Sequence, residues 1–199
     1  MATATSSRPW LALVAALALA SAAALAACGS DAPALISNAQ AFGWLRPSPP
    51  PHRWHESRLP DRSARLFYPR RWTSIRSDPG TVTAALRNGD GEIRGYLNAT
   101  PQQGEETLAN WASFRVAHNR DEGDVNVAPV ASATNLRFLG ARGSCVIDTY
   151  TSSTGHSYRE IACIVAGGTA TTVVVGAAPP QQWPRQGPAI ERAISSFLT

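Results

Sequence analysis

The feature that most constrains the fold is a symmetrical segment, SCVIDTYTSSTGHSYREIACIV, which contains two of the three cysteines. Two runs rich in β-branched and aromatic residues flank Ser153-Thr154-Gly155, and Cys145 and Cys163 are equidistant from Thr154. A hairpin turning there places the cysteines directly opposite each other, with Cα atoms about 4.5–5.5 Å apart, which a disulfide accepts. The segment therefore predicts a hairpin closed by a disulfide between these cysteines, with two reduced and buried cysteines as the alternative.

The same register brings two carboxyl groups together. It pairs Asp148 with Glu160 and Tyr150 with Tyr158, and like charges directly across a strand pair destabilise it. A carboxylate pair flanked by tyrosines suits a polar site that binds a cation or exchanges protons, because one carboxyl raises the pKa of the other. The more ordinary arrangement, which we expect, is a solvated face on which arginines such as Arg137 or Arg142 neutralise both charges, with the polar site as the alternative.

The N-terminal segment carries the pattern of an export signal. An apolar run from Trp10 to Ala27 consists almost entirely of alanine and leucine and stops at a cysteine, which is typical of a secretory signal peptide. Its end, Leu25-Ala26-Ala27-Cys28, resembles the bacterial lipobox, which implies cleavage before Cys28 and a diacylglyceryl group on its sulfur. We therefore expect a signal peptide over residues 1–27, with an uncleaved membrane anchor or a soluble secreted protein as the alternatives.

Lipidation and charge together predict where the protein lies. Two acyl chains such as palmitate anchor a protein stably, whereas one chain does so only marginally. All 18 basic residues are arginine and the formal net charge is +4, and an exported, tethered chain meets anionic lipid before nucleic acid. We expect an extracytoplasmic protein held on the cell membrane through Cys28, whose partners are the membrane and another envelope protein or lipid, and which binds no nucleic acid.

The chain after the signal peptide divides into a linker and one domain. Residues 28–63 are rich in proline and arginine and sustain no period of 2 or 3.6, which is typical of a linker. From residue 64 to residue 199, strand patterns alternate with turn signals, and apolar residues recur at helical spacing in two windows. We expect strands at 64–68, 81–86, 92–98, 125–130, 136–141, 144–151, 158–165 and 169–177, a further extended piece that ends at Ile75, and helices at 105–119 and from 188.

This order predicts an α+β fold, an antiparallel β-sheet meander with helices packed on one face. Within the last predicted strand, the run Val173-Val174-Val175 indicates a strand covered on both faces. The Phe67-Tyr68-Pro69-Arg70-Arg71-Trp72 opening, the strand-helix-meander order and the closing amphipathic helix resemble the PsbP/Mog1-like fold, in particular the actinobacterial lipoproteins of the LpqN/LpqT type. The resemblance extends from about Arg65 to Leu198. It implies a lipid-anchored envelope protein with a binding or assembly role and no common catalytic residues.

The sequence contains few signs of chemistry. His52 and His55 lie in the proline-rich segment with no third ligand, so we expect no metal, and no catalytic residue or cofactor is indicated. The nucleophile elbow, the phosphate-binding glycine loop and the metalloprotease helix are all absent from the sequence. We expect a non-enzymatic binding or assembly module. The alternatives are a carrier of a small apolar or lipid-like ligand between sheet and helices, and an extracytoplasmic hydrolase that uses Asp148 and Glu160.

Overall fold

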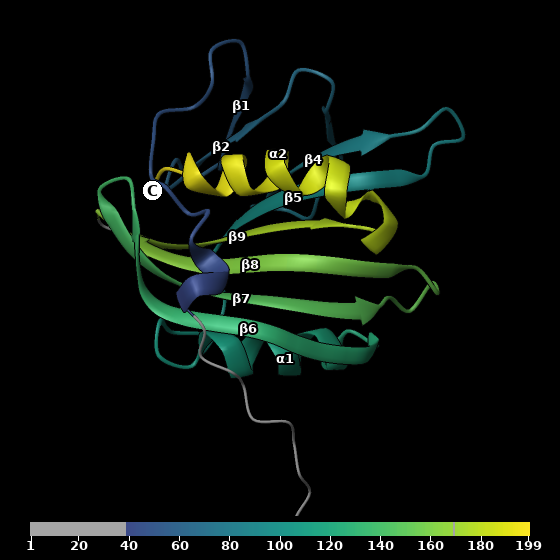
Figure 1. The fold of residues 1–199 in the computed structure, drawn as a ribbon. Helices are drawn as coiled ribbons and strands as arrows, with labels where there is room; N and C mark the ends of the chain where they lie inside the picture. Colours follow the sequence, from purple (N-terminus) through teal and green to yellow (C-terminus); the bar gives the residue numbers. More distant parts are fainter. Residues whose placement is uncertain (1–38, 169) are drawn as a thin grey trace, which may run out of the picture. The chain divides into compact units, whose positions relative to one another are not determined.

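The computed structural model describes residues 39–168 and 170–199 (Figure 1). The predicted signal peptide over residues 1–27, Cys28 and the first part of the predicted linker lie outside the described residues. Within the described part, no helix has the length and apolarity needed to cross a bilayer.

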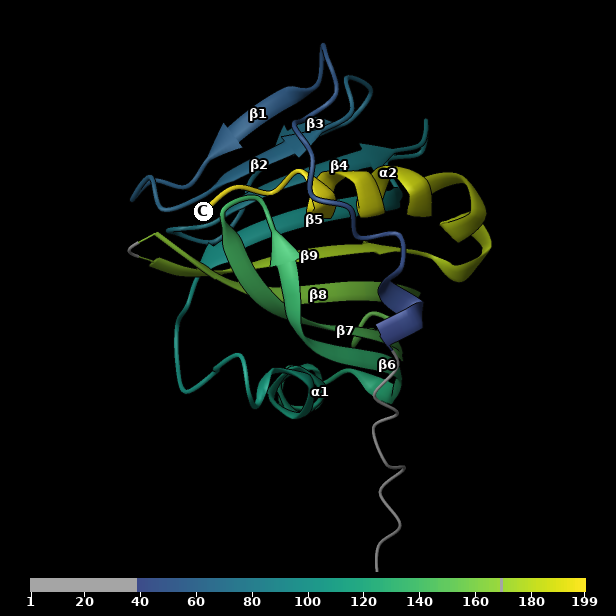
Figure 2. The same cartoon turned by 60° about the vertical axis from the view of Figure 1, so that its left-hand side comes forward.

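The described residues form a seven-stranded antiparallel sheet with the strand order β3-β4-β5-β9-β8-β7-β6, and a separate two-stranded sheet of β1 and β2. Figures 1 and 2 show two meanders side by side, one of β3, β4 and β5 and the other of β6, β7, β8 and β9. They join where β5 pairs with β9, so β6 lies at the far edge of the sheet. The elements are η1 (Ala39–Phe42), β1 (His55–Arg58), β2 (Arg65–Tyr68), β3 (Thr73–Ile75), β4 (Val82–Arg87), β5 (Ile93–Pro101), α1 (Trp111–Asp121), β6 (Val125–Phe138), β7 (Ala141–Thr151), β8 (Ser157–Gly167), β9 (Ala170–Ala178), η2 (Pro180–Gln182) and α2 (Trp183–Ser195).

The hairpin predicted around Thr154 is confirmed in its turn, its register and its disulfide. Strand β7 ends at Thr151 and β8 begins at Ser157. Cys145 lies directly opposite Cys163, with their Cα atoms 4.1 Å apart, and a disulfide joins them. The same register pairs residues 147 with 161, 148 with 160, and 150 with 158. The spacing of the two cysteines from one turn was therefore sufficient to predict the pairing of the central strands.

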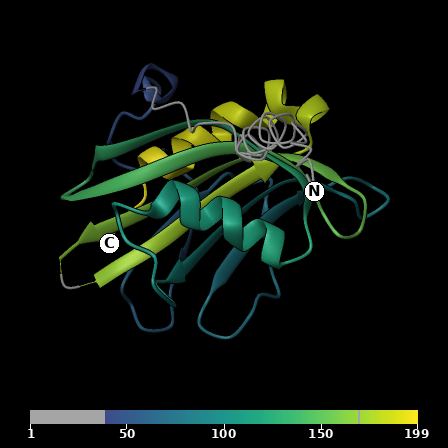
Figure 3. The same cartoon turned by 90° about the horizontal axis from the view of Figure 1, so that it is seen from below.

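The two helices lie on opposite faces of the large sheet, as Figure 3 shows from below, with α1 in front of the strands and α2 behind them. Side chains of β9 alternate between the two cores: Val173 and Val175 pack with Trp111 of α1, whereas Val174 packs with Ile190 of α2. The α+β class with an antiparallel sheet is confirmed, but the expectation that both helices share one face is wrong. The physical reason was already visible in the valine run, because a strand that is apolar on both faces needs a cover on each.

The proline-rich segment packs against the domain wherever the structure describes it. Phe42 and Leu59 are buried in the core on the α2 side, and the Ser48 amide donates a hydrogen bond to the Ser195 carbonyl at 3.2 Å. Strand β1 pairs with β2 along its whole length. The linker predicted over 28–63 is therefore wrong for residues 40–63, because scattered apolar side chains can pack without any regular period.

Three elements differ most in their bounds from the sequence-based expectation. Strand β6 is one bulged strand where two were expected, and it accommodates Asn126 and Asn135 at positive φ. Helix α1 begins at Trp111 instead of residue 105, because Asn110 holds the preceding turn by accepting a hydrogen bond from the Thr107 amide at 2.6 Å. Helix α2 begins five residues before Pro188, with Pro184 in its first turn.

Candidate functional site

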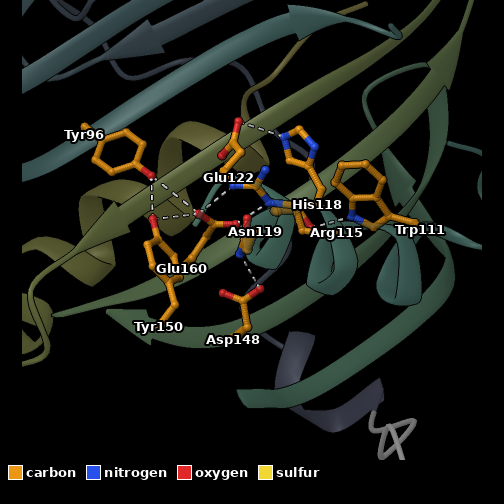
Figure 4. Close-up of polar contacts among 10 residues, drawn as sticks. Tyr96, Trp111, Arg115, His118, Asn119, Glu122, Asp148, Tyr150 and Glu160 are labelled. Carbon is orange, nitrogen blue, oxygen red and sulfur yellow. Dashed lines mark hydrogen bonds and ion pairs between the residues drawn. The ribbon is translucent and has the colours of Figure 1, made fainter. Parts of the chain in front are cut away.

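A buried polar network lies between α1 and the sheet (Figure 4). Glu160 of β8 is fully buried, and Arg115 of α1 binds both of its carboxylate oxygens. The distances are 2.7 Å from Nε to Oε1 and 2.9 Å from Nη2 to Oε2. Such a two-pronged pair is among the stronger ionic contacts in proteins, because both hydrogen bonds are charge-assisted. The carboxylate thus lies under α1, on the face of the sheet that the helix covers.

Two tyrosine hydroxyls complete the shell of the Glu160 carboxylate. The Tyr150 hydroxyl donates to Oε2 of Glu160 at 3.2 Å, and the Tyr96 hydroxyl lies 3.0 Å from that of Tyr150 and 3.5 Å from the same Oε2. Burial, and next the charge of Glu160, raise the pKa of both tyrosines, so both hydroxyls stay protonated. The ring of Tyr158 packs against both, with ring centres 6.0 Å from Tyr96 and 5.7 Å from Tyr150.

The charge of Glu160 is neutralised by Arg115. Burial alone lowers the pKa of Arg115, but Glu160 outweighs it and raises that pKa, so the guanidinium stays charged. The expected solvated face, neutralised by arginines such as Arg137 or Arg142, is wrong, because both carboxylates are buried and Arg115 pairs with Glu160. Arg142 instead donates a hydrogen bond to Asn135 at 2.8 Å, and α1 excludes water from the carboxylate pair.

Asp148 has fewer hydrogen-bond donors than Glu160, its partner across the strand pair. It is fully buried, and its hydrogen-bond donor is the Asn119 side-chain amide, 3.4 Å from Oδ2. Among the described residues, Oδ1 of Asp148 and Oδ1 of Asn119 have no partner. Burial, and next the charge of Glu160, raise the pKa of Asp148 to about 8. The upward direction agrees with the predicted effect of one carboxyl on the other, although burial is the larger cause.

We expect this protonated carboxyl to make stability fall as the pH rises from about 4 to about 8. The folded protein keeps a proton on Asp148 that the unfolded chain, with a pKa near 3.8, releases. The bound proton therefore stabilises the folded protein fully below the pKa of Asp148 in the unfolded chain. This stabilisation is lost as the pH rises through the pKa of Asp148 in the folded protein. Between these two pKa values, the free energy of unfolding falls by about 1 kcal/mol per pH unit for the one proton concerned.

Asp148→Asn isolates this effect, because it keeps the shape of the side chain and removes the titration. The difference in unfolding free energy between the wild type and this variant, from urea denaturation at each pH, should change with pH over that range. Asp61→Asn, at an exposed carboxyl, serves as the control. The difference in unfolding free energy between the wild type and this variant should stay small over the same pH range. A difference for Asp148→Asn that is flat between pH 4 and 8 would show that the buried carboxyl is ionised throughout.

A groove of about 510 Å³ opens beside this network. It exists because α1 packs over β6, β7 and β8, which leaves the same face of β5 and β9 open beside the helix. Tyr96 and Arg115 line the groove as well as belonging to the network. Apolar and aromatic side chains contribute much of the lining, chiefly Trp111, Phe114, Val173 and Val175.

One end of the groove holds a carboxylate oxygen that lacks a partner. Glu106 lines the groove and is 4% exposed. Its Oε1 accepts a hydrogen bond from the Gln103 amide at 2.7 Å, but its Oε2 has no partner among the described residues. A buried oxygen without a donor costs about 1–3 kcal/mol.

Sequence reasoning identified the strand half of the network but not the helix half. Arg115 and Asn119 follow Trp111 at intervals of four residues, so all three lie on one face of α1. Polar residues at that spacing, on the face that buries a tryptophan, were the signal that could have revealed them. Within residues 39–168 and 170–199, no group of three or more His, Cys, Asp or Glu side chains could hold a metal ion.

Comparison with known proteins places the chain by its fold. No protein-family model and no curated protein matches it. Cyanobacterial PsbP (CyanoP) from Synechocystis sp. PCC 6803 is similar at a TM-score of 0.52 and 12% identity, over 73% of this chain and 92% of that one. LpqN of Mycobacterium tuberculosis, involved in cell envelope biogenesis, aligns at a TM-score of 0.40 and 13% identity over 74% and 91%. A protein of unknown function from Pseudomonas aeruginosa aligns at 0.48 and 15% over 73% and 96%. The likeness to CyanoP shows a PsbP-like α+β fold.

Proposed function

We propose that this chain is a lipid-anchored cell-envelope protein whose domain is a non-enzymatic binding module for another envelope component. The lipobox-like residues ending at Cys28 support the anchor, because they follow an apolar export signal. The buried disulfide of Cys145 and Cys163 supports a location outside the cytoplasm, where such bonds form and persist.

The groove beside α1 is the observation that carries the binding role. Its volume of about 510 Å³ lies within the usual range for ligand sites, and its lining combines an apolar wall with many polar side chains. The unpartnered Oε2 of Glu106 favours a ligand that carries a hydroxyl or amino donor. The site therefore suits a polar part of an envelope component more than a bare acyl chain.

The burial of the carboxylates argues for binding instead of catalysis. Asp148 and Glu160 are both fully buried, and the donors that surround Glu160 come from Arg115 and two tyrosines. A general acid or base must come within hydrogen-bond reach of its substrate. We infer that this network holds α1 in place, and that the hydrolase hypothesis requires α1 to move.

The second candidate function is that of a carrier for a small apolar or lipid-like ligand. Phe114, Val173 and Val175 favour it, because together they give the groove an apolar wall. The many polar side chains that share the lining favour the first candidate, since an acyl chain leaves them without partners.

The packing of the proline-rich segment brings the domain close to the proposed anchor. Phe42 and residues that follow it pack on the domain, and ten residues separate Cys28 from the described chain, which begins at Ala39. The eleven Cα-to-Cα steps from Cys28 to Ala39 span at most about 40 Å when fully extended. On this proposal the chain between the anchored cysteine and the start of the described domain is no longer than about 40 Å.

We expect a metabolic label to test the anchor. Grown with alkyne-palmitate, cells should incorporate the label into the wild-type protein and not into Cys28→Ala, because the acyl groups attach at that residue. Ser30→Ala, two positions further on, should keep the label and serves as the control. A wild-type protein that fractionates with the membrane without any label disproves the lipid anchor.

Photocrosslinking tests the groove. A benzophenone side chain at Gln103, which lines the groove, should give a discrete adduct in intact cells, whereas the same group at Ala117 on the exposed side of α1 should give none. Thr100→Trp fills the groove and should abolish the Gln103 adduct, while Ser113→Trp, outside the groove, should retain it. Equal adducts from both reporter positions, or an adduct that survives Thr100→Trp, contradict binding in the groove.

A further inference from the structure

A second hollow, on the α2 side of the sheet, collects basic side chains from three separate segments. Arg71 lies in the turn before β3, Arg87 at the end of β4, and Arg185 in the first turn of α2. Together they line a depression of about 680 Å³, to which Arg94 of β5 also contributes. Figure 1 shows α2 running beside β4 and β5, which places these segments next to one another. None of the described residues that line the hollow is acidic.

Three of the four arginines that line this hollow lack a counter-charge among the described residues. Within residues 39–168 and 170–199, Arg71, Arg87 and Arg185 take part in no ion pair or side-chain hydrogen bond. Arg94 does have a partner, with its Nη2 3.0 Å from Oε2 of Glu92. The hollow therefore gathers three uncompensated positive charges. Like charges that line one hollow repel each other, and a bound anion reduces that repulsion.

The convergence of the arginines is built into the packing of the fold. Gly95 of β5 lets two other segments approach the strand: a Cβ atom there would lie 3.1 Å from Cη2 of Trp72 and 3.5 Å from Cβ of Gln186. Trp72 is buried, and it fixes the turn that carries the neighbouring Arg71. Gln186 follows Arg185 in α2. The backbone positions of two of the three arginines are therefore set by contacts across one glycine.

The chemistry of the lining indicates the class of ligand. An arginine guanidinium matches phosphate oxygens with two parallel donors, and several arginines together suit a group with several acceptor oxygens. Gln182 and Gln186 add amide groups, while Trp72, Leu86 and Ala189 give the hollow an apolar side. We propose that Arg71, Arg87 and Arg185 form a binding site for a phosphate group, carried either by an anionic lipid headgroup or by a small soluble compound. This site uses neither Cys28 nor the groove beside α1.

Isothermal titration calorimetry on the full chain in detergent tests the site. The probes are inorganic phosphate and glycerophosphoglycerol, the water-soluble headgroup of phosphatidylglycerol. We expect saturable binding of at least one probe, and a loss of about tenfold in affinity for each arginine removed in Arg87→Gln and Arg185→Gln. Tighter binding of glycerophosphoglycerol identifies a lipid headgroup as the source, and tighter binding of inorganic phosphate identifies a soluble compound.

Arg120→Gln is the matched control, because it removes the same charge from an exposed residue of α1 that lies outside this hollow. It should change the affinity by less than about twofold, since only the general attraction of a screened charge is lost. Both pocket residues are exposed, so the urea midpoint of each variant should stay near that of the wild type. The absence of saturable binding of either probe overturns the proposal, and so does an equal loss of affinity in Arg120→Gln.

Discussion

Replacing Arg115 with methionine is expected to lower the free energy of unfolding by about 3–5 kcal/mol, because the change leaves a buried carboxylate without its counter-charge. Glu160 is fully buried, and Arg115 supplies two of its hydrogen bonds at 2.7 and 2.9 Å. Methionine keeps much of the length of the arginine side chain, so packing against the sheet changes little. Urea denaturation followed by tryptophan fluorescence measures the difference.

The double variant Arg115→Met/Glu160→Gln separates the unpaired charge from the loss of packing. Removing both charges should recover most of the lost stability, because a buried ion pair and a neutral replacement are often close in free energy. Arg120→Met, on the exposed side of the same helix, should change stability by less than about 0.5 kcal/mol. A cost below about 1 kcal/mol for Arg115→Met alone indicates that water already reaches Glu160 in the folded protein.

The second large effect is expected from removing the disulfide. Cys145→Ala/Cys163→Ala should lower the free energy of unfolding by about 3 kcal/mol, since the unfolded chain regains the freedom of a loop of 18 residues. Both cysteines are buried in the core on the α2 side of the sheet, so the truncated side chains also leave unfilled space that adds to the cost. Urea denaturation with and without dithiothreitol gives the comparison.

Reduction provides the internal control for this variant. Dithiothreitol should destabilise the wild-type protein by a similar amount and leave Cys145→Ala/Cys163→Ala unaffected, because that variant has no bond to reduce. Since the bond is buried, its reduction in the wild type should follow the rate of unfolding instead of the thiol concentration. A wild-type denaturation curve that does not change on full reduction shows that the disulfide does not stabilise the fold.

The central hairpin shows what local sequence can predict. Strand residues alternate between faces with a period of two, so the position of one turn determines every opposed pair. The turn around Thr154 therefore placed Cys145 against Cys163 and Asp148 against Glu160 before any tertiary information was used. The carboxylate pair could be predicted, and so could the upward shift of a carboxyl pKa.

The environment of that pair depended on a helix that is distant in sequence. Arg115 lies 45 residues from Glu160, and only the packing of α1 over β7 and β8 brings them together. Sequence reasoning instead expected water and arginines from the neighbouring strand, because nothing in the hairpin specifies which element covers its polar face. For the same reason, the sequence-based prediction placed both helices on one face of the sheet. The run Val173-Val174-Val175 already indicated that both faces of this strand are covered.

Pairing across one short turn depends on residues close together in the chain, so the amino-acid order was enough to establish the antiparallel hairpin, its disulfide and the α+β class. The groove beside α1 and the arginine pocket beside α2 arise instead from elements that meet across the sheet, such as Trp72 and Gln186 on either side of Gly95. Only the tertiary structure determines where these two hollows lie. Which side chains are buried, and which charges are paired, depends on the surfaces that pack together, and these surfaces come from residues far apart in the sequence.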